Sequence, residues 1–133
     1  MEETVRLPDD AMLSVRGITK SFGTNDVLKG VDMDIARGSV AALIGGNGAG
    51  KSTLVKIIMG IYQPDDGEVF LQGRPARLGK PSASLAAGIY LVPQEPMLFP
   101  NMTVEENVLM GFMEKASELH KRLAKLLTHL DWT

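Results

Sequence analysis

The chain contains no cysteine among its 133 residues, which excludes disulfide bonds and thiolate chemistry. A basic excess is also absent, because the formal net charge is -2 and nucleic-acid-binding proteins usually carry a positive surplus. We therefore expect no nucleic-acid partner. No run of about 18 apolar residues occurs, so the sequence predicts no transmembrane helix. The acidic, polar start, MEETVRLPDD, does not fit a secretory signal.

The composition that remains is that of an ordinary globular protein, with 44% hydrophobic and 23% charged residues. A chain of this length is sufficient for one domain with a hydrophobic core. Histidine is scarce, since His120 and His129 are the only two and both lie in a stretch of helical periodicity. We expect surface roles for both rather than metal binding.

Three strands are predicted from short-range patterns. Residues 12–18 favour a short strand, and in 27–38 the apolar residues from Val31 onward alternate with aspartates, which indicates a half-exposed strand. A third strand is predicted within residues 63–73, between two turns.

Two other segments are continuously apolar and predict strands that are covered on both faces. They are VAALI at 40–44 and IYLV at 89–92. Pro93 ends the second run, because proline has no N–H to donate to a strand ladder.

Helical periodicity predicts an amphipathic helix over residues 51–62, directly after a glycine-rich stretch. Its apolar face consists of Leu54, Ile57, Ile58 and Ile61. A longer helix is predicted over residues 114–130, where a leucine stripe opposes lysine and glutamate and must be buried against something. The stripe consists of Leu119, Leu123, Leu126, Leu127 and Leu130.

Capping residues predict two shorter helices. Ser82 is a candidate cap of a helix that stops near Gly88. Thr103 and Glu106 have the spacing of a capping box, and the helix that they begin is expected to end near Gly111.

The glycine-rich stretch matches the phosphate-binding pattern G-x-x-x-x-G-K-[ST] at Gly45, Gly50, Lys51 and Ser52. Glycines allow successive N–H groups to point inward and form an anion nest, and the following helix adds its positive N-terminal end. Lys51 is long enough to reach the β- and γ-phosphates of a nucleotide, Ser52 is a candidate Mg²⁺ ligand, and Thr53 is a candidate phosphate contact. The alternative is a flexible linker that matches by chance, but the predicted strand before it and helix after it favour phosphate binding.

The phosphate pattern alone leaves ATPases, GTPases and small-molecule kinases open. Four segments in order resemble those of ABC transporter ATP-binding subunits. ITKSFGTNDVLKGVDMDIARGSVAALIG resembles the N-terminal antiparallel sheet, and GGNGAGKSTLVKIIMG resembles the Walker A region. QPDDGEVFLQG resembles the segment after the first helix, and VPQEPMLFPNMTVEENV resembles the Q-loop with its following helix. The resemblance covers residues 12–112. Within the family it is closest to the sugar importers, and Gly46 together with GIYLVPQEPMLFPNMTVEENVLMG is most similar to the N-terminal cassette of the autoinducer-2 type.

The resemblance implies roles for matching residues. Phe22 is implied to stack on adenine, and Gln94 to approach Mg²⁺ and the attacking water; the simpler alternatives are a core aromatic and a solvated loop glutamine. Lys51 and Gln94 are thereby the implied catalytic residues, and Ser52 and Gln94 the implied Mg²⁺ contacts. The implied nucleotide-binding set is Phe22, Gly45, Gly46, Asn47, Gly48, Ala49, Gly50, Lys51, Ser52 and Thr53.

The implied fold is α/β: a P-loop ABC ATPase core with an N-terminal antiparallel β subdomain, truncated within the helical subdomain. Residues 1–11 are expected to be a flexible leader. Residues 12–112 are expected to be the first part of the cassette, with the phosphate loop and the Q-loop, and 113–133 the incomplete start of the helical subdomain.

The implied cofactors are ATP and Mg²⁺. The implied partners are a second ATP-binding cassette, transmembrane permease subunits and, indirectly, a periplasmic binding protein. The permease is implied to meet the Q-loop region at Met97, Leu98 and Phe99, for which the alternative is a loop tucked onto its own domain. The implied location is cytoplasmic, peripheral on the inner face of the cell membrane.

Three family motifs do not occur in the sequence: a hydrophobic strand ending in Asp-Glu, an LSGGQ-like signature and a switch histidine. We therefore expect an N-terminal fragment of a cassette that does not turn over ATP by itself, because phosphoryl transfer also needs a positioned water. The leucine stripe and unpaired strand edges lead us to expect self-association or lowered stability. The alternatives are a naturally short regulatory module that binds nucleotide without turnover, and another P-loop NTPase, although no NKxD-like guanine motif is present.

Overall fold

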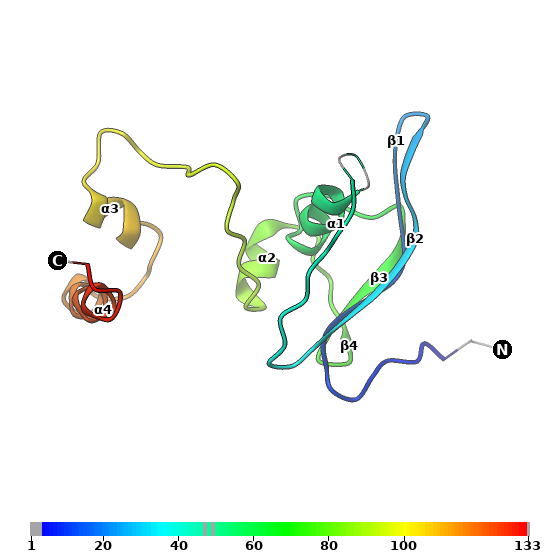
Figure 1. The fold of residues 1–133 in the computed structure, drawn as a ribbon, viewed down its shortest axis with the longest axis horizontal. Helices are drawn as coiled ribbons and strands as arrows, with labels where there is room; N and C mark the ends of the chain where they lie inside the picture. The colour runs from blue at the N-terminus through cyan, green and yellow to red at the C-terminus, as the bar shows by residue number, and fades with distance from the viewer. Residues whose placement is uncertain (1–3, 47, 49, 133) are drawn as a thin grey trace. The chain divides into compact units, whose positions relative to one another are not determined.

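The computed structural model describes residues 4–46, 48 and 50–132. The chain forms two compact units, residues 1–92 and residues 93–133, which we call the first and the second unit. In the described part of the chain, the first unit holds a sheet and two helices, and the second unit holds two further helices (Figure 1).

The first unit is built on a four-stranded antiparallel sheet. Its strands are β1 (Ala11–Phe22), β2 (Asn25–Ala36), β3 (Asp66–Leu71) and β4 (Arg74–Pro75). Their order in the sheet is β2-β1-β3-β4, so β1 pairs with both long neighbours. The three strands predicted from the sequence are confirmed, and the first is longer than predicted.

Helix α1 (Lys51–Ile58) packs on this sheet through its apolar face (Figure 1). Leu54 and Ile57 are almost fully buried and join a cluster contributed by the three long strands. Those strand residues are Leu13, Val15, Ile18, Leu28 and Val69. Ile61 lies beyond the end of the helix and is 48% exposed, so the predicted apolar face is confirmed only as far as Ile58.

Helix α2 (Pro81–Ala86) begins differently from the sequence prediction. Ser82 makes no capping hydrogen bond; Lys80 occupies the cap position and Pro81 the first turn, where a missing N–H has no cost. The proposed cap at Ser82 is therefore wrong, whereas the end of the helix next to Gly88, with φ +87°, is confirmed. The buried Ser84 hydroxyl donates to the carbonyl oxygen of Ile58 at 3.0 Å and joins α2 to α1.

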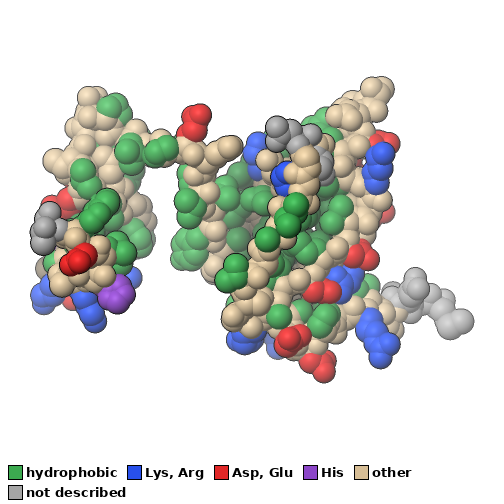
Figure 2. Space-filling model, in the orientation of Figure 1, with side chains coloured by type: hydrophobic (Ala, Val, Ile, Leu, Met, Phe, Trp, Pro, Cys, Tyr) green, Lys and Arg blue, Asp and Glu red, His purple; other side chains and the backbone are tan. Residues whose placement is uncertain are grey.

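The two predicted buried strands, 40–44 and 89–92, are wrong for this structure. Both segments lack ladder partners and are largely exposed: Val40 is 102%, Ile44 90% and Val92 91% exposed. A strand forms only where a neighbour accepts its backbone hydrogen bonds, and no described residues pair with either segment. Figure 2 shows hydrophobic side chains open to solvent on this unit as well as the next.

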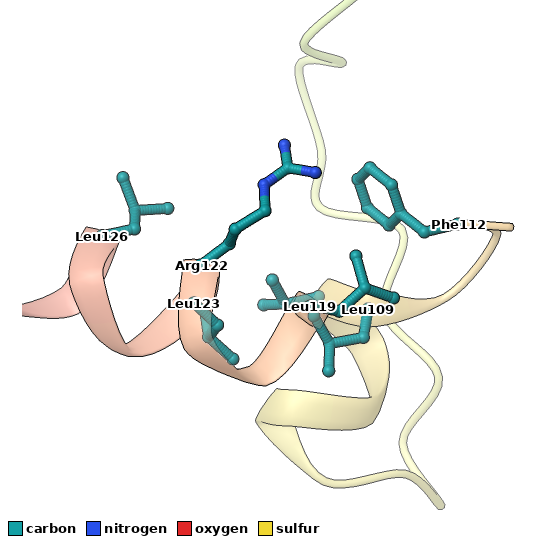
Figure 3. A pocket seen from close by; sticks show the side chains of 7 residues that line it. Leu109, Phe112, Leu119, Arg122, Leu123 and Leu126 are labelled. Atoms are coloured by element: carbon teal, nitrogen blue, oxygen red, sulfur yellow. The ribbon is translucent and has the colours of Figure 1, made fainter. Parts of the chain in front are cut away.

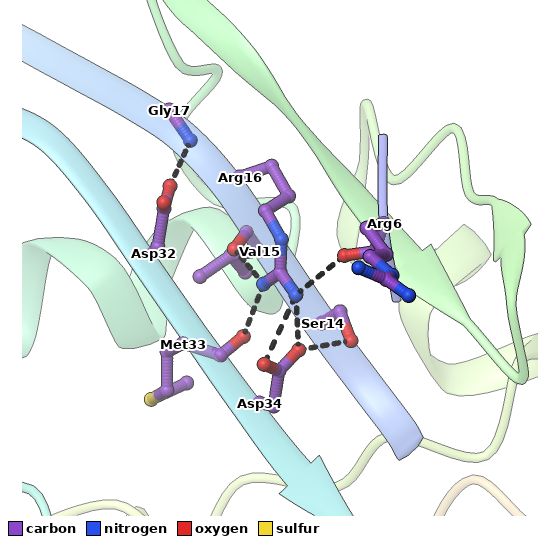
Figure 4. A network of polar contacts seen from close by, with 8 residues as sticks. All are labelled: Arg6, Ser14, Val15, Arg16, Gly17, Asp32, Met33 and Asp34. Carbon is purple, nitrogen blue, oxygen red and sulfur yellow. Dashed lines mark hydrogen bonds and ion pairs between the residues drawn. The ribbon is translucent and has the colours of Figure 1, made fainter. Parts of the chain in front are cut away.

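A network of polar side chains fixes β1 against β2 (Figure 4). The Ser14 hydroxyl donates to Asp34 at 2.6 Å, and the Arg16 guanidinium lies 2.8 Å from the same carboxylate. The Ser14 hydrogen bond, followed by Arg16, lowers the pKa of Asp34 from its ordinary value. The Gly17 N–H donates to Asp32 at 2.7 Å, where the register of the two strands shifts.

The second unit consists of an extended segment followed by α3 (Val104–Leu109) and α4 (Ala116–His129). The capping box is confirmed, since Thr103 accepts from the N–H of Glu106 and the Glu106 carboxylate accepts from the N–H of Thr103. The hydrogen bond from the Thr103 N–H to the Glu106 carboxylate, followed by the Thr103 side chain, lowers the pKa of Glu106 from its ordinary value. In α4, Leu119 is buried, and His120 is half exposed and contacts Glu105 on α3.

Among the described residues, none of the helices is long and apolar enough to cross a membrane.

Candidate functional site

The glycine-rich loop leads directly into α1 through a left-handed residue. Gly50 is the N-cap of α1 with φ +90° and is buried, and Gly48 also has a positive φ, +83°. Because positive φ is accessible to glycine at little cost, these two positions depend on glycine. The Leu54 N–H donates to the Gly50 carbonyl at 2.9 Å, which closes the first turn.

Lys51, the first residue of α1, folds back over the loop. Its ammonium group donates to the carbonyl oxygens of Gly45 and Gly46, at 3.1 Å in the second case. The N–H groups of the first turn of a helix have no acceptor within that helix, so they remain available to an anion beside the same loop. A positive charge and the N–H groups of the first turn thus gather at the start of α1.

The loop, the start of α1 and the turn between β1 and β2 enclose one hollow of about 330 Å³. The residues that line it are Phe22, Asn25, Val27, Gly46, Gly48, Gly50, Lys51, Ser52 and Thr53. Phe22 is therefore brought together with the phosphate-binding pattern, although 23 residues of chain separate it from Gly46. Asn25 and Val27 were not predicted from the sequence. They lie at the start of β2, and the alternation of a strand does not indicate which ligand site its first residues border.

Phe22 lies at the end of β1 and is 43% exposed. Its ring meets the ring of Tyr62 edge to face, with centroids 5.3 Å apart and planes at 66°. The Lys20 ammonium lies 5.5 Å from the Phe22 centroid. An exposed flat ring next to cationic groups offers a face to a planar ligand group.

Asp65 holds the strand end that carries Phe22. Its carboxylate accepts from the Ser21 N–H at 2.7 Å and from Lys20 at 3.3 Å, and its own N–H donates to the Thr19 carbonyl at 2.9 Å. The Ser21 hydrogen bond, followed by Lys20, lowers the pKa of Asp65 from its ordinary value. Neither Tyr62 nor Asp65 was identified from the sequence as a site residue, because Tyr62 ends the helix predicted over residues 51–62 and Asp65 lies in the turn predicted after it.

Four predicted site residues remain, namely Gly45, Asn47, Ala49 and Gln94. Gly45 contributes the carbonyl oxygen that binds Lys51 but does not line the hollow. Asn47 and Ala49 lie outside the described residues. Gln94 belongs to the second unit, where it is exposed and follows Pro93 in a non-helical segment.

In the second unit, one side chain holds the exposed apolar segment after Gln94. Asn107 accepts from the Phe99 N–H at 2.7 Å and donates to the Phe99 carbonyl at 3.1 Å, and it also donates to the Thr103 carbonyl at 2.9 Å. The neighbouring side chains stay open, with Met97 85% and Leu98 68% exposed. The segment is therefore held at its backbone while its side chains face solvent.

Helices α3 and α4 enclose an apolar groove of about 280 Å³ (Figure 3). It is lined by Val108, Leu109, Phe112, Leu119, Arg122, Leu123 and Leu126. Leu126 at its end is 50% exposed, so the leucine stripe predicted from the sequence is only partly covered.

Comparison with known proteins identifies the family. The ABC transporter family profile matches residues 28–132. The chain belongs to the ABC transporter family. Over 120 residues it is 50% identical to the autoinducer 2 import ATP-binding protein LsrA of Enterobacter sp. strain 638, covering 90% of this chain and 24% of that protein. It is also 50% identical over 100 residues to the ribose import ATP-binding protein RbsA of Yersinia pestis, covering 75% and 20%.

Solved ATP-binding cassettes share the fold. The cassette MJ1267 matches with a TM-score of 0.80 at 30% identity, over 91% of this chain and 54% of that one. CbiO1 of Clostridium perfringens, part of the ABC transporter complex cbiONQ, matches with a TM-score of 0.76 at 29% identity, over 92% and 51%. The α/β fold class and the recognition of an ABC ATP-binding subunit are confirmed. The chain spans about a quarter of the length of its LsrA relative.

Proposed function

We propose that this chain supplies the ATP-binding part of the energy-coupling subunit of an ABC importer for a sugar or a sugar-like signal such as autoinducer-2. The observation that carries the proposal is the shared hollow, which unites an exposed aromatic ring, Phe22, with a cation, Lys51, and the start of α1. Such a hollow offers separate surfaces to the flat base and the charged phosphates of a nucleotide. The similarity to importer proteins supports the transport setting.

The residues in the hollow fit ATP with Mg²⁺. Lys51 and the N–H groups of the first turn of α1 complement phosphate oxygens, and Thr53 adds a hydroxyl. Ser52 is exposed in the first turn and presents an oxygen, the ligand type that Mg²⁺ prefers. When bound, Mg²⁺ would neutralise phosphate charge. We assign the phosphate loop to residues 45–53, including Asn47 and Ala49.

Domain limits and the remaining roles follow from the same proposal. Residues 12–112 form the first part of the cassette, 113–133 begin its helical subdomain and 1–11 lead into it.

Gln94 approaches the metal and the attacking water in a closed cassette, where a neutral amide orients water without titrating. The cassette works at the inner face of the cell membrane with a second cassette, permease subunits and, through these, a periplasmic binding protein.

The permease contact is proposed at the segment that Asn107 holds. Met97, Leu98 and Phe99 expose large apolar surfaces, with Phe99 at 54%, and exposed apolar clusters commonly mark protein contacts.

A titration with a fluorescent ATP analogue tests the proposal on the purified chain. We expect saturable binding that is stronger with Mg²⁺ and that falls at least tenfold in Lys51→Ala, since a charged hydrogen-bonding partner of phosphate is lost. Lys29→Ala is the matched control, because it removes the same charge from an exposed strand residue outside the hollow. Equal affinity for the Lys51→Ala and Lys29→Ala variants would contradict the proposal.

A second candidate is a regulatory module that binds nucleotide without a transport partner. Both candidates predict nucleotide binding, so the titration does not distinguish them. They differ in whether the chain binds permease subunits. If the chain co-purifies with permease subunits expressed in the same cells, the importer is favoured. Retention of nucleotide binding without such capture favours the module.

A further inference from the structure

We infer that Tyr62 is a positioning residue for nucleotide recognition: it sets the orientation of the Phe22 ring and joins that ring to the helix that starts at the phosphate loop. The inference rests on the proposed function and adds to it a residue that no phosphate-binding pattern contains. Tyr62 does not line the hollow, so its influence on a ligand passes through Phe22.

The rings of Phe22 and Tyr62 are in contact. Their centroids are 5.3 Å apart and their planes meet at 66°, which is the favourable edge-to-face geometry of aromatic pairs. Phe22 is 43% exposed, so the protein encloses its ring only in part. A half-exposed ring would otherwise sample several orientations, and ordering it on binding lowers affinity.

Tyr62 itself is anchored at the end of α1. Its side chain is half buried and packs against the hydrophobic core of the first unit. Its N–H donates to the Lys56 carbonyl at 3.2 Å, at the end of α1, and the Lys56 ammonium lies 5.3 Å from its ring centroid. Tyr62 therefore moves with α1.

Helix α1 also carries the charged end of the hollow. Lys51, Ser52 and Thr53 form its first turn, and Tyr62 follows its last turn. One short helix thus connects the groups placed for phosphates with the ring that orients Phe22. Tyr62 thus orients the Phe22 ring relative to the groups placed for phosphates, and we expect a ligand with both a base and phosphates to be sensitive to it.

The experiment compares a ligand with a base and one without. The affinities of Mg²⁺-ATP and of tripolyphosphate are measured by displacement of the same fluorescent ATP analogue. The variants are Tyr62→Leu, which keeps apolar volume but removes the ring, and Tyr62→Phe, which keeps the ring. Tyr90→Leu is the control, because Tyr90 is the other tyrosine of the chain and is 79% exposed, outside the hollow.

We expect Tyr62→Leu to weaken ATP binding about threefold to tenfold, as loss of an aromatic pair contact does, and to change tripolyphosphate binding less than twofold. Tyr62→Phe and Tyr90→Leu should match the unaltered chain for both ligands. Two results overturn the inference alone. In the first, ATP binding depends on Lys51 but has the same affinity in Tyr62→Leu. In the second, Tyr62→Leu weakens the binding of ATP and of tripolyphosphate equally, which indicates general damage to the fold. ATP binding that does not depend on Lys51 overturns the proposed function, and this inference with it.

Discussion

A Cβ atom at Gly50 would lie 2.6 Å from Cδ2 of Leu28 and 3.2 Å from the carbonyl oxygen of Val27. Leu28 is only 5% exposed and belongs to the core, so its side chain has little space to move away. Gly50 also has φ +90°, which is strained for any residue with a Cβ. The glycine before Lys51 therefore allows close packing of the loop on β2 in addition to shaping the loop.

Gly50→Ala is expected to lower the free energy of unfolding by about 2 kcal/mol or more, because backbone strain and overlap with β2 add together. Gly48→Ala is the control: it has a similar φ, +83°, but among the described residues no atom lies within 4 Å of an added Cβ, so about 1–2 kcal/mol is expected. Urea unfolding followed by circular dichroism measures both. Equal losses in the two variants would show that contact with Leu28 has no effect.

The purified chain is expected to bind ATP without steady release of phosphate. Hydrolysis needs a metal, the phosphate loop and a positioned water together, and the sequence contains no apolar strand ending in Asp-Glu to position that water. Loss of such a residue lowers the rate by several factors of ten. A phosphate-release assay checks this, and activity that Lys51→Ala abolishes would refute it.

Asn107→Ala is expected to release the backbone of the apolar segment while leaving the first unit unchanged. The variant removes the acceptor of the Phe99 N–H and the donors to the Phe99 and Thr103 carbonyls. Hydrogen exchange at the Phe99 amide should become about fivefold to tenfold faster, corresponding to about 1 kcal/mol. Asn101→Ala, in the same exposed segment, is the control and should leave the Phe99 amide unaffected.

The capping box predicts a pH dependence at the start of α3. The hydrogen bonds from Thr103 lower the folded-state pKa of Glu106, so its contribution to stability is present above its unfolded pKa and is lost as pH falls through the lower folded value. Nuclear magnetic resonance titration of the Glu106 carboxyl detects the shift directly. In Thr103→Ala the pKa should move upward, and an unchanged pKa would exclude the hydroxyl as a cause.

Self-association is expected because both units expose large apolar side chains, among them Val40 and Ile44 in the first unit and Leu126 in the second. Leu126→Gln should lower the association constant measured by sedimentation equilibrium. Thr128→Gln, an exposed residue of the same helix, is the control and should leave it unchanged. A monodisperse monomer of the unaltered chain at high concentration would contradict this prediction.

Local features could be predicted from the sequence because short-range physics determines them. The alternation in 27–38, the apolar face that contains Leu54 and Ile57, and the Thr103–Glu106 capping box each depend on neighbours a few residues apart. All three are present in the structure. The predicted cap at Ser82 was wrong, since α2 begins earlier, with Lys80 as the cap and Pro81 in the first turn. Proline is favoured there because it has no N–H that needs an acceptor.

The segments 40–44 and 89–92 depend on long-range partners. Their apolar composition favours strands, but a strand also needs backbone partners from distant parts of a chain, and none of the described residues provides them. Composition reports the preference of a segment to be buried. It does not report whether another strand is in place beside it.

By itself, the sequence determined the phosphate-binding pattern, the strand and helix patterns and the family, because these depend on residue types at fixed spacings. Only the tertiary structure decided that Phe22 shares a hollow with Lys51, that Tyr62 contacts the Phe22 ring and that Asn107 holds the Phe99 backbone. These relationships arise from strand pairing and from the packing of α1 on the sheet, which bring together residues that are far apart in the chain.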